Sequence, residues 1–545
     1  MGFAIRFQGK ITLSLFGIDA SQQSCLVASE VLETGPKEPE TRTLWEPDPS
    51  SDRTFEDRFV RLYVEVKSLT DSAIHEMAYV TDTAPMNTVS LSIGLCSFNR
   101  EQELRETVSE LRDFKRRTPE VRDVFVINQG ARIADPGLLS TLDKPGFHHV
   151  EQGNFGGTGG FTRSMIEALS IEDPASFHLV MDDDIDLDAR VIKRALQFLK
   201  YAHSDVAIGG QMLDLWRNNI LFEAGAKLNR FWTVNSLGSG TDVGDPANLH
   251  FFDDNLDIDY NAWWFCMIPT RTIRAIDFSP PLFIHVDDIE YGCRMKKSGI
   301  KTIPLPGVGV WHEPFTYKKT DWMLYYDIRN RLINATAHPE ISEPPDTLYV
   351  FGFIMNFVLI HRYRAARLSS RAVRDFLSGP VGEIWLDSAK AHEGLIAFLN
   401  EMDAPPLLSD LSASQFEEVP RMHLPEGTWG IVKQFVVSFV ALNLPRRKGR
   451  TPLIVHGDAH PGGVGAAPYL HAANETTTQG RLYKPNRRRL WLTTLEAVFV
   501  TLSYAFRRKA ASRKWKSGLP QLQTREAWVR MFENAQNASA VDSGD

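Results

Sequence analysis

The fold is decided by His178-Leu179-Val180-Met181-Asp182-Asp183-Asp184-Ile185-Asp186. A short apolar run of this kind is typical of a buried strand, and here it ends in three adjacent carboxylates. Ligands of α/β proteins bind at the carboxyl ends of strands, and a divalent cation relieves the repulsion between neighbouring carboxylates. The alternative is a solvated acidic turn that caps a helix over residues 189–199. The stretch therefore predicts a buried strand that ends in either a metal site or a helix start.

Predicted strands alternate with predicted helices around this stretch. Residues 89–96, 121–128 and 148–150 are expected to form strands, and residues 101–116 are expected to form a helix. Such alternation is typical of strands joined by helical crossovers. It predicts an α/β fold with a doubly wound, mostly parallel sheet.

A glycine-rich run, Asn154-Phe155-Gly156-Gly157-Thr158-Gly159-Gly160-Phe161, precedes a predicted helix that reaches Ser170. A lone glycine motif is weak evidence for a nucleotide site. We interpret these glycines as allowing the backbone to approach a nucleotide or sugar at the helix N-terminus. A plain tight turn is the alternative.

Residues 206–330 supply further site candidates. Glu223 and Trp232 lie on a β-like stretch. Trp263 and Trp264 adjoin an apolar strand, where one would be buried and the other could face a cleft, because neighbouring side chains of a strand point to opposite faces. Asp287, Asp288 and Glu290 lie on a loop that enters a helix, where they supply a general base or simply complement the helix dipole. His312 ends another predicted strand, as a metal ligand or as an ordinary histidine.

Three domains are predicted. Residues 1–88 indicate a β-sandwich-like domain, with the clearest strand over residues 59–67. Residues 89–335 are the α/β domain, and residues 336–545 are expected to be mainly helical, basic and membrane-associating. Within this last part, residues 449–486 are expected to be an irregular or disordered loop.

The net charge of −8 is unevenly placed along the chain. Residues 421–545 contain 19 Lys and Arg against 8 Asp and Glu, a balance of +11, which leaves −19 for residues 1–420. Apolar runs over 431–444 and 490–506 are followed by the basic clusters Arg446-Arg447-Lys448 and Arg507-Arg508-Lys509. This design favours a membrane surface as partner. Nucleic acid is the other anionic class, but no recognised nucleic-acid motif accompanies the charge.

The cysteines and the apolar segments of the chain indicate the cellular compartment of the protein. Four scattered cysteines without a CxxC pair are typical of a reducing compartment. No signal peptide is apparent, and no apolar run reaches the roughly 20 residues that span a bilayer. We expect a cytoplasmic protein, peripheral on the inner face of the cell membrane.

Seven motifs together resemble a known family. In order, they are Cys96-Ser97-Phe98-Asn99-Arg100, Asn128-Gln129-Gly130, the glycine-rich run, Asp182-Asp183-Asp184, Asn261-Ala262-Trp263-Trp264, Asp287-Asp288-Ile289-Glu290-Tyr291 and Trp311-His312. The set resembles bacterial galactofuranosyltransferases of glycosyltransferase family 2, among them the polymerising enzymes of mycobacterial cell-wall galactan. The resemblance covers residues 89–335 and implies a GT-A, Rossmann-like catalytic domain.

The resemblance also implies an activity and residue roles. The activity is inverting, metal-dependent transfer of galactofuranose from UDP-galactofuranose to a glycan or lipid-linked glycan acceptor. Asp182, Asp184 and His312 would hold manganese or magnesium. Asp288 would be the general base with Asp287 beside it, and Glu290 or Glu223 would be next in line. The donor would be bound by Arg100, Gln129, Asn154, Gly156, Gly157, Asp182, Asp183, Trp263 and Trp264, and the acceptor by Glu223, Trp232 and Trp264.

Several alternatives stay open at this point. The chain is short for a polymerising enzyme, so single addition is equally compatible with the motifs. A rhamnosyltransferase that uses dTDP-rhamnose, or a non-catalytic scaffold that binds nucleotide sugars, would carry a similar pattern. A homo-oligomer is also left open, and nucleic acid is not expected as a partner.

Overall fold

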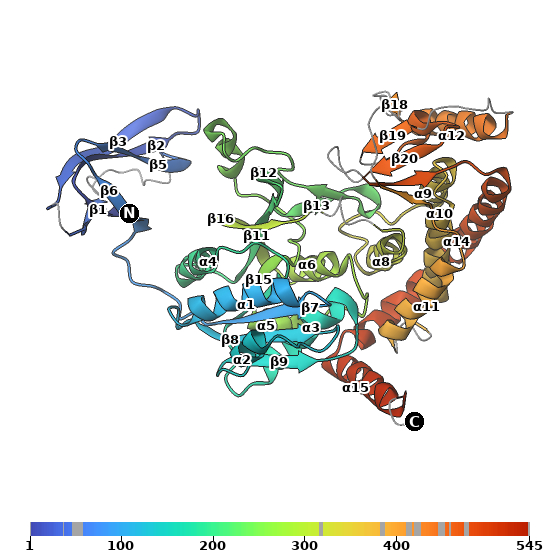
Figure 1. The fold of residues 1–545 in the computed structure, drawn as a ribbon, viewed down its shortest axis with the longest axis horizontal. Helices are drawn as coiled ribbons and strands as arrows, with labels where there is room; N and C mark the ends of the chain where they lie inside the picture. The colour runs from blue at the N-terminus through green and yellow to red at the C-terminus, as the bar shows by residue number, and fades with distance from the viewer. Residues whose placement is uncertain are drawn as a thin grey trace. The chain divides into compact units, whose positions relative to one another are not determined.

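A computed structural model describes residues 2–35, 38–45, 58–314, 320–381, 387–409, 417–418, 427–444, 453–456, 459–472 and 479–542. The chain divides into two compact units, drawn as a ribbon in Figure 1. The first unit comprises Met1–Thr88, Gln197–His203 and Thr241–Asp257, and the second comprises the rest. Because the second unit joins residues 89–196 to the helical region, the predicted boundary at residue 335 stays a prediction.

The first unit contains two three-stranded antiparallel sheets with one shared core. The sheets have the orders β4-β1-β6 and β3-β2-β5. Alternate residues of β1 and β2, such as Phe3, Ile5, Leu13 and Leu15, are buried in this core, as the two-residue period of a strand requires. The strands are β1 (Gly2–Gln8), β2 (Lys10–Ile18), β3 (Ser24–Glu33), β4 (Glu40–Trp45), β5 (Arg61–Ser68) and β6 (Ala73–Val80).

An eight-stranded mixed sheet forms the centre of the second unit. Its order is β12-β11-β15-β10-β7-β8-β9, and β16 pairs with β11. The neighbours in β10-β7-β8-β9 are parallel, as are β11 and β16, whereas β15 is antiparallel to both of its neighbours. The strands are β7 (Leu91–Ser97), β8 (Val121–Asn128), β9 (Phe147–Glu151), β10 (Phe177–Asp182), β11 (Val206–Asp214), β12 (Arg217–Glu223), β15 (Phe265–Pro269) and β16 (Lys301–His312). The predicted α/β class with a Rossmann-like, mostly parallel sheet is confirmed.

The predicted helices of this sheet region form because one face of each is apolar. In α1 (Glu101–Lys115), Leu104, Val108 and Leu111 recur at helical spacing and are buried. Acidic residues lie in its first turn and basic residues in its last, which complements the helix dipole. The further helices are α2 (Pro136–Leu142), α3 (Gly156–Ser170), α4 (Arg190–Lys200), α5 (Thr270–Ile276) and α6 (Asp287–Lys297).

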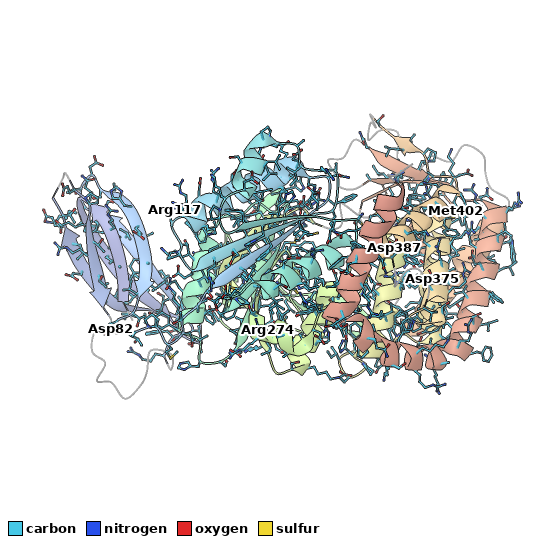
Figure 2. The ribbon with its side chains drawn as sticks, turned by 90° about the horizontal axis from the view of Figure 1, so that it is seen from below. Asp82, Arg117, Arg274, Asp375, Asp387 and Met402 are labelled. Atoms are coloured by element: carbon cyan, nitrogen blue, oxygen red, sulfur yellow. The ribbon has the colours of Figure 1, made fainter. Side chains whose placement is uncertain are left out.

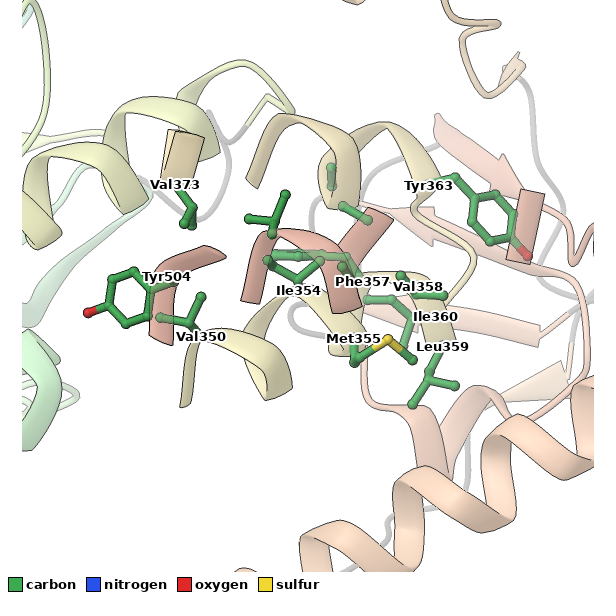
Figure 3. Packing of buried hydrophobic residues seen from close by; sticks show 14 of the residues in the cluster. Val350, Ile354, Met355, Phe357, Val358, Leu359, Ile360, Tyr363, Val373 and Tyr504 are labelled. Atoms are coloured by element: carbon green, nitrogen blue, oxygen red, sulfur yellow. The ribbon is translucent and has the colours of Figure 1, made fainter. Parts of the chain in front are cut away.

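The helical region of the second unit has its own core. Figure 3 shows part of it: Val350, Ile354 and Val358 of α9 pack near Val373 and Tyr504. A polar link joins a further helix to that of Val373, since the hydroxyl of Tyr325 on α8 donates to Asp375 on α10 at 2.6 Å (Figure 2 labels Asp375). The helices are α8 (Met323–Ala337), α9 (Thr347–Leu359), α10 (Tyr363–Ser378), α11 (Ser388–Asn400), α12 (Gly427–Asn443), α13 (Pro461–Val464), α14 (Arg487–Leu522) and α15 (Arg525–Asp542).

The prediction of an irregular loop over residues 449–486 is wrong. A five-stranded sheet of order β17-β21-β20-β19-β18 draws three of its strands from this segment. The strands are β17 (Leu407–Leu408), β18 (Glu417–Glu418), β19 (Leu453–His456), β20 (Tyr469–Ala472) and β21 (Gly480–Tyr483). Each has at most four residues, too few to give a clear period in the sequence.

The predicted apolar helices near the basic clusters are present, in α12 and α14. The cluster Arg446-Arg447-Lys448 lies outside the described residues, whereas Arg507, Arg508 and Lys509 lie within α14. Of the helices that the structure describes, none offers an apolar stretch of the length that a bilayer crossing needs.

Candidate functional site

The site is built at the carboxyl edge of the large sheet. Strand β10 ends at Asp182, and β16, which runs in the same direction, ends at His312. The Nε2 atom of His312 lies 3.2 Å from Oδ1 of Asp184 and 3.8 Å from Oδ2 of Asp182. The ligand atoms of these three residues all lie within 4.8 Å of one another. The structure therefore brings together the three residues that were predicted to hold a metal.

A backbone bridge places the histidine beside the acidic turn. The N–H of Asp186 donates to the carbonyl of Trp311 at 2.8 Å, and the N–H of Trp311 donates back at 3.2 Å. His312 directly follows the bridged Trp311, and Asp184 lies two positions before the bridged Asp186. The two reciprocal hydrogen bonds thus hold the strand end that carries His312 beside the turn that carries Asp182 and Asp184.

Arg100 counterbalances the acidic turn. It follows β7, and its NH1 atom pairs with Oδ2 of Asp184 and lies 3.5 Å from Oδ1 of Asp183. Asp183 itself is buried, and burial raises the pKa of its carboxyl to about 6. Asp183 is therefore a buried member of the acidic turn and is not one of the three residues of the metal cluster.

The cluster fits a hard divalent cation. Two carboxylates and one imidazole nitrogen at this spacing are donors that manganese accepts readily, and magnesium less readily because it prefers oxygen. Three protein ligands leave further coordination positions for ligand oxygens, such as those of a diphosphate. The residues present therefore fit the manganese or magnesium site predicted from the sequence.

The glycine-rich run serves mainly close packing. Gly156 has φ +68° and lies against the backbone carbonyl of Phe283, and Gly160 lies against the thiol of Cys96. Neither position has room for a side chain. At Gly157, by contrast, an added Cβ would only touch the ring of Phe161, at 4.0 Å, and the residue is partly exposed. Of the two predicted donor-binding glycines, Gly157 is the one that leaves its surroundings open to a ligand.

Gln129 and Asn154 shape the turn before this helix. The Gln129 amide donates to the carbonyl of Gly156 at 2.8 Å and accepts from the N–H of Phe155 at 2.9 Å. The side chain of Asn154 accepts from the N–H of Gly156 at 3.0 Å. Gln129 is buried and Asn154 is half-buried. These contacts hold the turn, and a direct role of the two residues in donor binding stays a prediction.

Asp287 and Asp288, the two candidates for the general base, begin helix α6. The hydroxyl of Thr158 donates to Oδ2 of Asp287 at 2.7 Å, which ties α3 to α6. Burial raises the pKa of Asp287, against this hydrogen bond. Burial, followed by the negative charges of Asp287 and Glu223, raises the pKa of Asp288 well above its usual value. The carboxyl groups of Asp287, Asp288 and Glu223 thus lie in one poorly solvated region, where a carboxyl group readily stays protonated.

Glu223 lies at the end of β12 and is buried. Its carboxylate accepts a hydrogen bond from the hydroxyl of Ser236, and burial raises its pKa to about 7 against that hydrogen bond. Glu290 differs, because Arg294 donates to it at 2.8 Å and 2.9 Å and Gln523 donates at 3.1 Å. The carboxylate of Glu290 is therefore already occupied by hydrogen bonds within the helix packing. Glu223 is the better of the two alternative candidates for the general base.

The tryptophans are placed differently from the expectation. Trp263 and Trp264 precede β15, and both are buried, so the expectation that one faces a cleft is wrong in this structure. Trp263 packs edge-on against Phe161, and the indole of Trp264 donates to the carbonyl of Gly210 at 2.9 Å. Trp232 lies in a 3₁₀ turn, Arg230–Trp232, rather than on a strand, and is also buried. A direct role of these rings in donor or acceptor binding stays a prediction.

A cavity of about 510 Å³ adjoins the base loop. Its wall is mostly apolar and includes Ile328, Tyr349 and Phe353, while His285 and Arg331 are among its polar members. Nδ1 of His285 lies 2.7 Å from Asp327, which also lines the cavity. The volume is in the range of small-molecule sites.

Several residues of this region were missed from the sequence. His285 precedes Asp287 by two positions, so its place in the same loop was a signal that could have been used. Ser236 and Tyr260 reach Glu223 only through the fold, since Ser236 is 13 positions away from it and Tyr260 shares its electrostatic environment. No local pattern marks such contacts.

Two curated proteins are similar to this chain. Galactofuranosyltransferase GlfT2 of Mycobacterium tuberculosis is 32% identical over 328 residues, and GlfT2 of Mycolicibacterium smegmatis is 29% identical over 346 residues. The chain resembles mycobacterial galactofuranosyltransferases. The resemblance predicted from the seven motifs is thus confirmed. The matches cover 55% and 58% of this chain but 50% and 52% of the relatives, so the chain spans about half the length of these galactofuranosyltransferases.

No protein-family model matches the chain. Solved structures with a detectable likeness include GalNAc-T7 with UDP, GalNAc and Mn²⁺, at 12% identity and a TM-score of 0.35 over 58% of this chain and 55% of that one. Mannosyltransferase PcManGT of Pyrobaculum calidifontis, with GDP-Man and Mn²⁺, has 10% identity and a TM-score of 0.31 over 59% and 84%.

Proposed function

We propose that this chain is an inverting, metal-dependent GT-A glycosyltransferase that transfers galactofuranose from UDP-galactofuranose to a cell-surface glycan. The observation that carries the proposal is the cluster of Asp182, Asp184 and His312 at one edge of a mostly parallel sheet. Its similarity to galactofuranosyltransferases supports the choice of sugar. The intact cluster also argues against a scaffold that has lost its chemistry.

The donor diphosphate is the group that the acidic edge would hold. Asp182, Asp184 and His312 would bind manganese or magnesium, which supplies positive charge to a departing diphosphate. Arg100 pairs with Asp184 in this structure, and with a cation in the cluster its guanidinium is placed to turn to a phosphate oxygen. Gly157 and Asn154 would border the nucleotide at the start of α3.

The acceptor hydroxyl requires a base, because its own pKa is far above neutral. We assign this role to Asp288, whose raised pKa brings it closer to the working pH of a general base. Asp287, fixed by Thr158, would orient it. A single carboxylate base without a protein nucleophile predicts direct displacement, and hence inversion at the anomeric carbon.

A lipid-linked glycan is the acceptor class that the surroundings favour. The 510 Å³ cavity with its apolar wall is lined in part by His285, which lies three positions before Asp288 of α6. It would hold the apolar part of an acceptor whose sugar lies at Glu223 and Trp232. The nature of the lipid and the linkage formed are separate questions for the assay.

The C-terminal helices supply a surface for the membrane. Phe499 is 68% exposed and Phe506 is 84% exposed on one face of α14, next to Arg507 and Lys509. The exposed apolar residues of this face are Trp491, Leu492, Leu495, Val498, Phe499, Leu502 and Phe506. Helix α12 extends the apolar face, since Phe439 packs edge-on against Trp491. Apolar faces bordered by basic residues bind anionic membrane surfaces.

A donor-panel assay tests the proposed activity. Purified protein is incubated with manganese, a galactofuranosyl acceptor and either UDP-galactofuranose or dTDP-rhamnose, and the product mass is measured. We expect galactofuranose to be added and chelation to stop the reaction. Addition of rhamnose instead would establish the rhamnosyltransferase alternative, and no transfer from either donor despite UDP binding would support the scaffold.

A further inference from the structure

The loop that delivers the two candidate base residues has an unusual backbone. Phe283, His285 and Val286 all have positive φ angles, of 75°, 65° and 67°. This conformation is unfavourable for residues with a side chain, and most of all for a β-branched one such as Val286. Val286 is the residue immediately before Asp287 and α6. The direction in which Asp287 and Asp288 leave the loop therefore depends on a conformation that the loop would not adopt alone.

Helix α8 supplies the hydrogen bonds that hold this conformation. The side-chain amide of Asn330 donates to the carbonyls of Ile284 at 2.9 Å and His285 at 2.8 Å, and reaches that of Leu282 at 3.2 Å. One turn along the helix, Asn334 donates to the carbonyl of Val286 at 2.9 Å. The carbonyls of Leu282, Ile284, His285 and Val286 thus point at α8 instead of at solvent.

Asn330 is itself fixed in orientation. It is fully buried, and its Oδ1 atom accepts from Nε of Arg329 at 2.9 Å, which leaves the NH₂ group to face the loop. Arg329 also donates to the carbonyl of Leu282 at 2.6 Å. Asparagine is a poor choice for the interior of a helix, so its presence here is explained by the loop rather than by α8.

The opposite side of the loop is closed by the glycine-rich helix. The N–H of Thr158 donates to the carbonyl of Phe283 at 3.1 Å, and its hydroxyl donates to Asp287. The loop is therefore held between α3, which also borders the proposed donor site, and α8, which also lines the cavity.

We propose that Asn330 is a positioning residue for the transfer reaction: by holding the carbonyls of residues 284 and 285, it fixes where Asp287 and Asp288 stand relative to the acceptor. The proposal rests on the proposed function. General-base catalysis requires the acid within hydrogen-bond reach of the hydroxyl, and a displacement of about 1 Å can lower a rate by about 10²-fold. Asn330 is fully buried and would act only through the loop.

Asn330→Ala is the direct test, with Thr336→Val as the matched control. Thr336 is buried on the same helix, its hydroxyl donates to the carbonyl of Leu332 within α8 at 3.0 Å, and it lies 3.3 Å from the hydroxyl of Ser512, away from the loop. For Asn330→Ala we expect kcat to fall at least about tenfold while the Kd for UDP and manganese stays unchanged. We also expect amide hydrogen exchange over residues 283–288 to rise at least about tenfold, as the loop opens locally. Thr336→Val should change none of these quantities.

The possible outcomes distinguish the proposed role of Asn330 from the proposed glycosyltransferase function on which it rests. Unchanged kcat with faster loop exchange, or equal losses of kcat and UDP binding, would show a merely structural role and overturn the proposal. If the wild type transfers no sugar at all, the proposed function fails, whereas the exchange measurement still decides whether Asn330 holds the loop. If Asn330→Ala does not fold, Asn334→Ala removes only the hydrogen bond to Val286 and is measured in the same way. Wild-type values for Asn334→Ala would likewise overturn the proposal.

Discussion

Gly156 fits against the carbonyl oxygen of Phe283 only because it has no side chain: a Cβ atom there would overlap with that oxygen. This contact joins the glycine-rich turn to the loop that carries Asp287 and Asp288. Gly156→Ala should therefore destabilise the protein by about 1–3 kcal/mol, since it adds a left-handed alanine to the overlap. Thermal or urea unfolding measures the change. Gly157→Ala is the matched control, because its Cβ would make only an ordinary contact with the ring of Phe161, at 4.0 Å, and equal losses in both variants would contradict the packing explanation.

The second prediction concerns the metal cluster. Asp184→Ala removes one of the three ligands and the partner of Arg100, so manganese binding and manganese-dependent transfer should both be lost. Calorimetric titration with manganese measures the first, and the donor assay measures the second. Asp188→Ala, a nearby acid that pairs with Arg190, should keep both. Near-full activity of Asp184→Ala in the presence of a chelator would exclude a catalytic metal here.

The third prediction concerns the base. Asp288→Asn keeps the shape of the side chain but cannot take a proton, so transfer should fall by at least about 10²-fold with stability and UDP binding retained. The exposed Asp277→Asn serves as the control and should be fully active. The helix-dipole alternative predicts a stability loss of only about 0.3–1 kcal/mol and little kinetic effect. If Asp287→Asn is inactive and Asp288→Asn is not, the base is Asp287.

The fourth prediction is a pH dependence of stability. Burial raises the pKa of Glu223 to about 7, against about 4.3 in an unfolded chain. A carboxyl whose folded pKa is raised stabilises the fold below pH 4, and this contribution is lost as the pH rises through 7. Glu223→Gln should therefore gain up to about 4 kcal/mol over the wild type at pH 8.5 and nothing at pH 4. Thermal melts at both pH values check this. Glu393→Gln, at an exposed position on α11, should show no such gain.

The fifth prediction concerns the membrane surface. Reversing Arg507 and Lys509 to Glu should weaken binding to anionic vesicles, since each basic residue near such a surface contributes about 1 kcal/mol. Vesicle flotation at low and high salt measures the effect. Reversing Lys193 on α4 and Arg117 in the turn after α1, both exposed, makes the same change of net charge and should leave binding intact (Figure 2 labels Arg117). Equal binding to neutral and anionic vesicles would refute an electrostatic contribution to membrane binding. Tighter binding to RNA would indicate nucleic acid as the partner of the basic region.

Much of the sheet and of the acidic edge could be predicted because their signals are local. The apolar run before Asp182 and the alternation of strands and helices depend on neighbouring residues, and the structure has these elements at the predicted places. The partners of Glu223 and the holding of the base loop by Asn330 could not be predicted, since they join segments far apart in sequence. The burial of both Trp263 and Trp264 was missed for another reason, because the strand begins only at Phe265 and the alternation rule does not reach them.

The packing of α15 has a consequence for the synthesis of the protein. Trp528, Met531 and Phe532 of this helix complete the core around Phe155 and Phe161 at the start of α3. Ribosomes add about 5–20 residues per second, so the apolar side of α3 waits on the order of tens of seconds for these residues to emerge. During that interval the nascent chain carries an open core at its glycine-rich helix. We expect the nascent chain to be a client of chaperones that bind at the ribosome until α15 docks on α3.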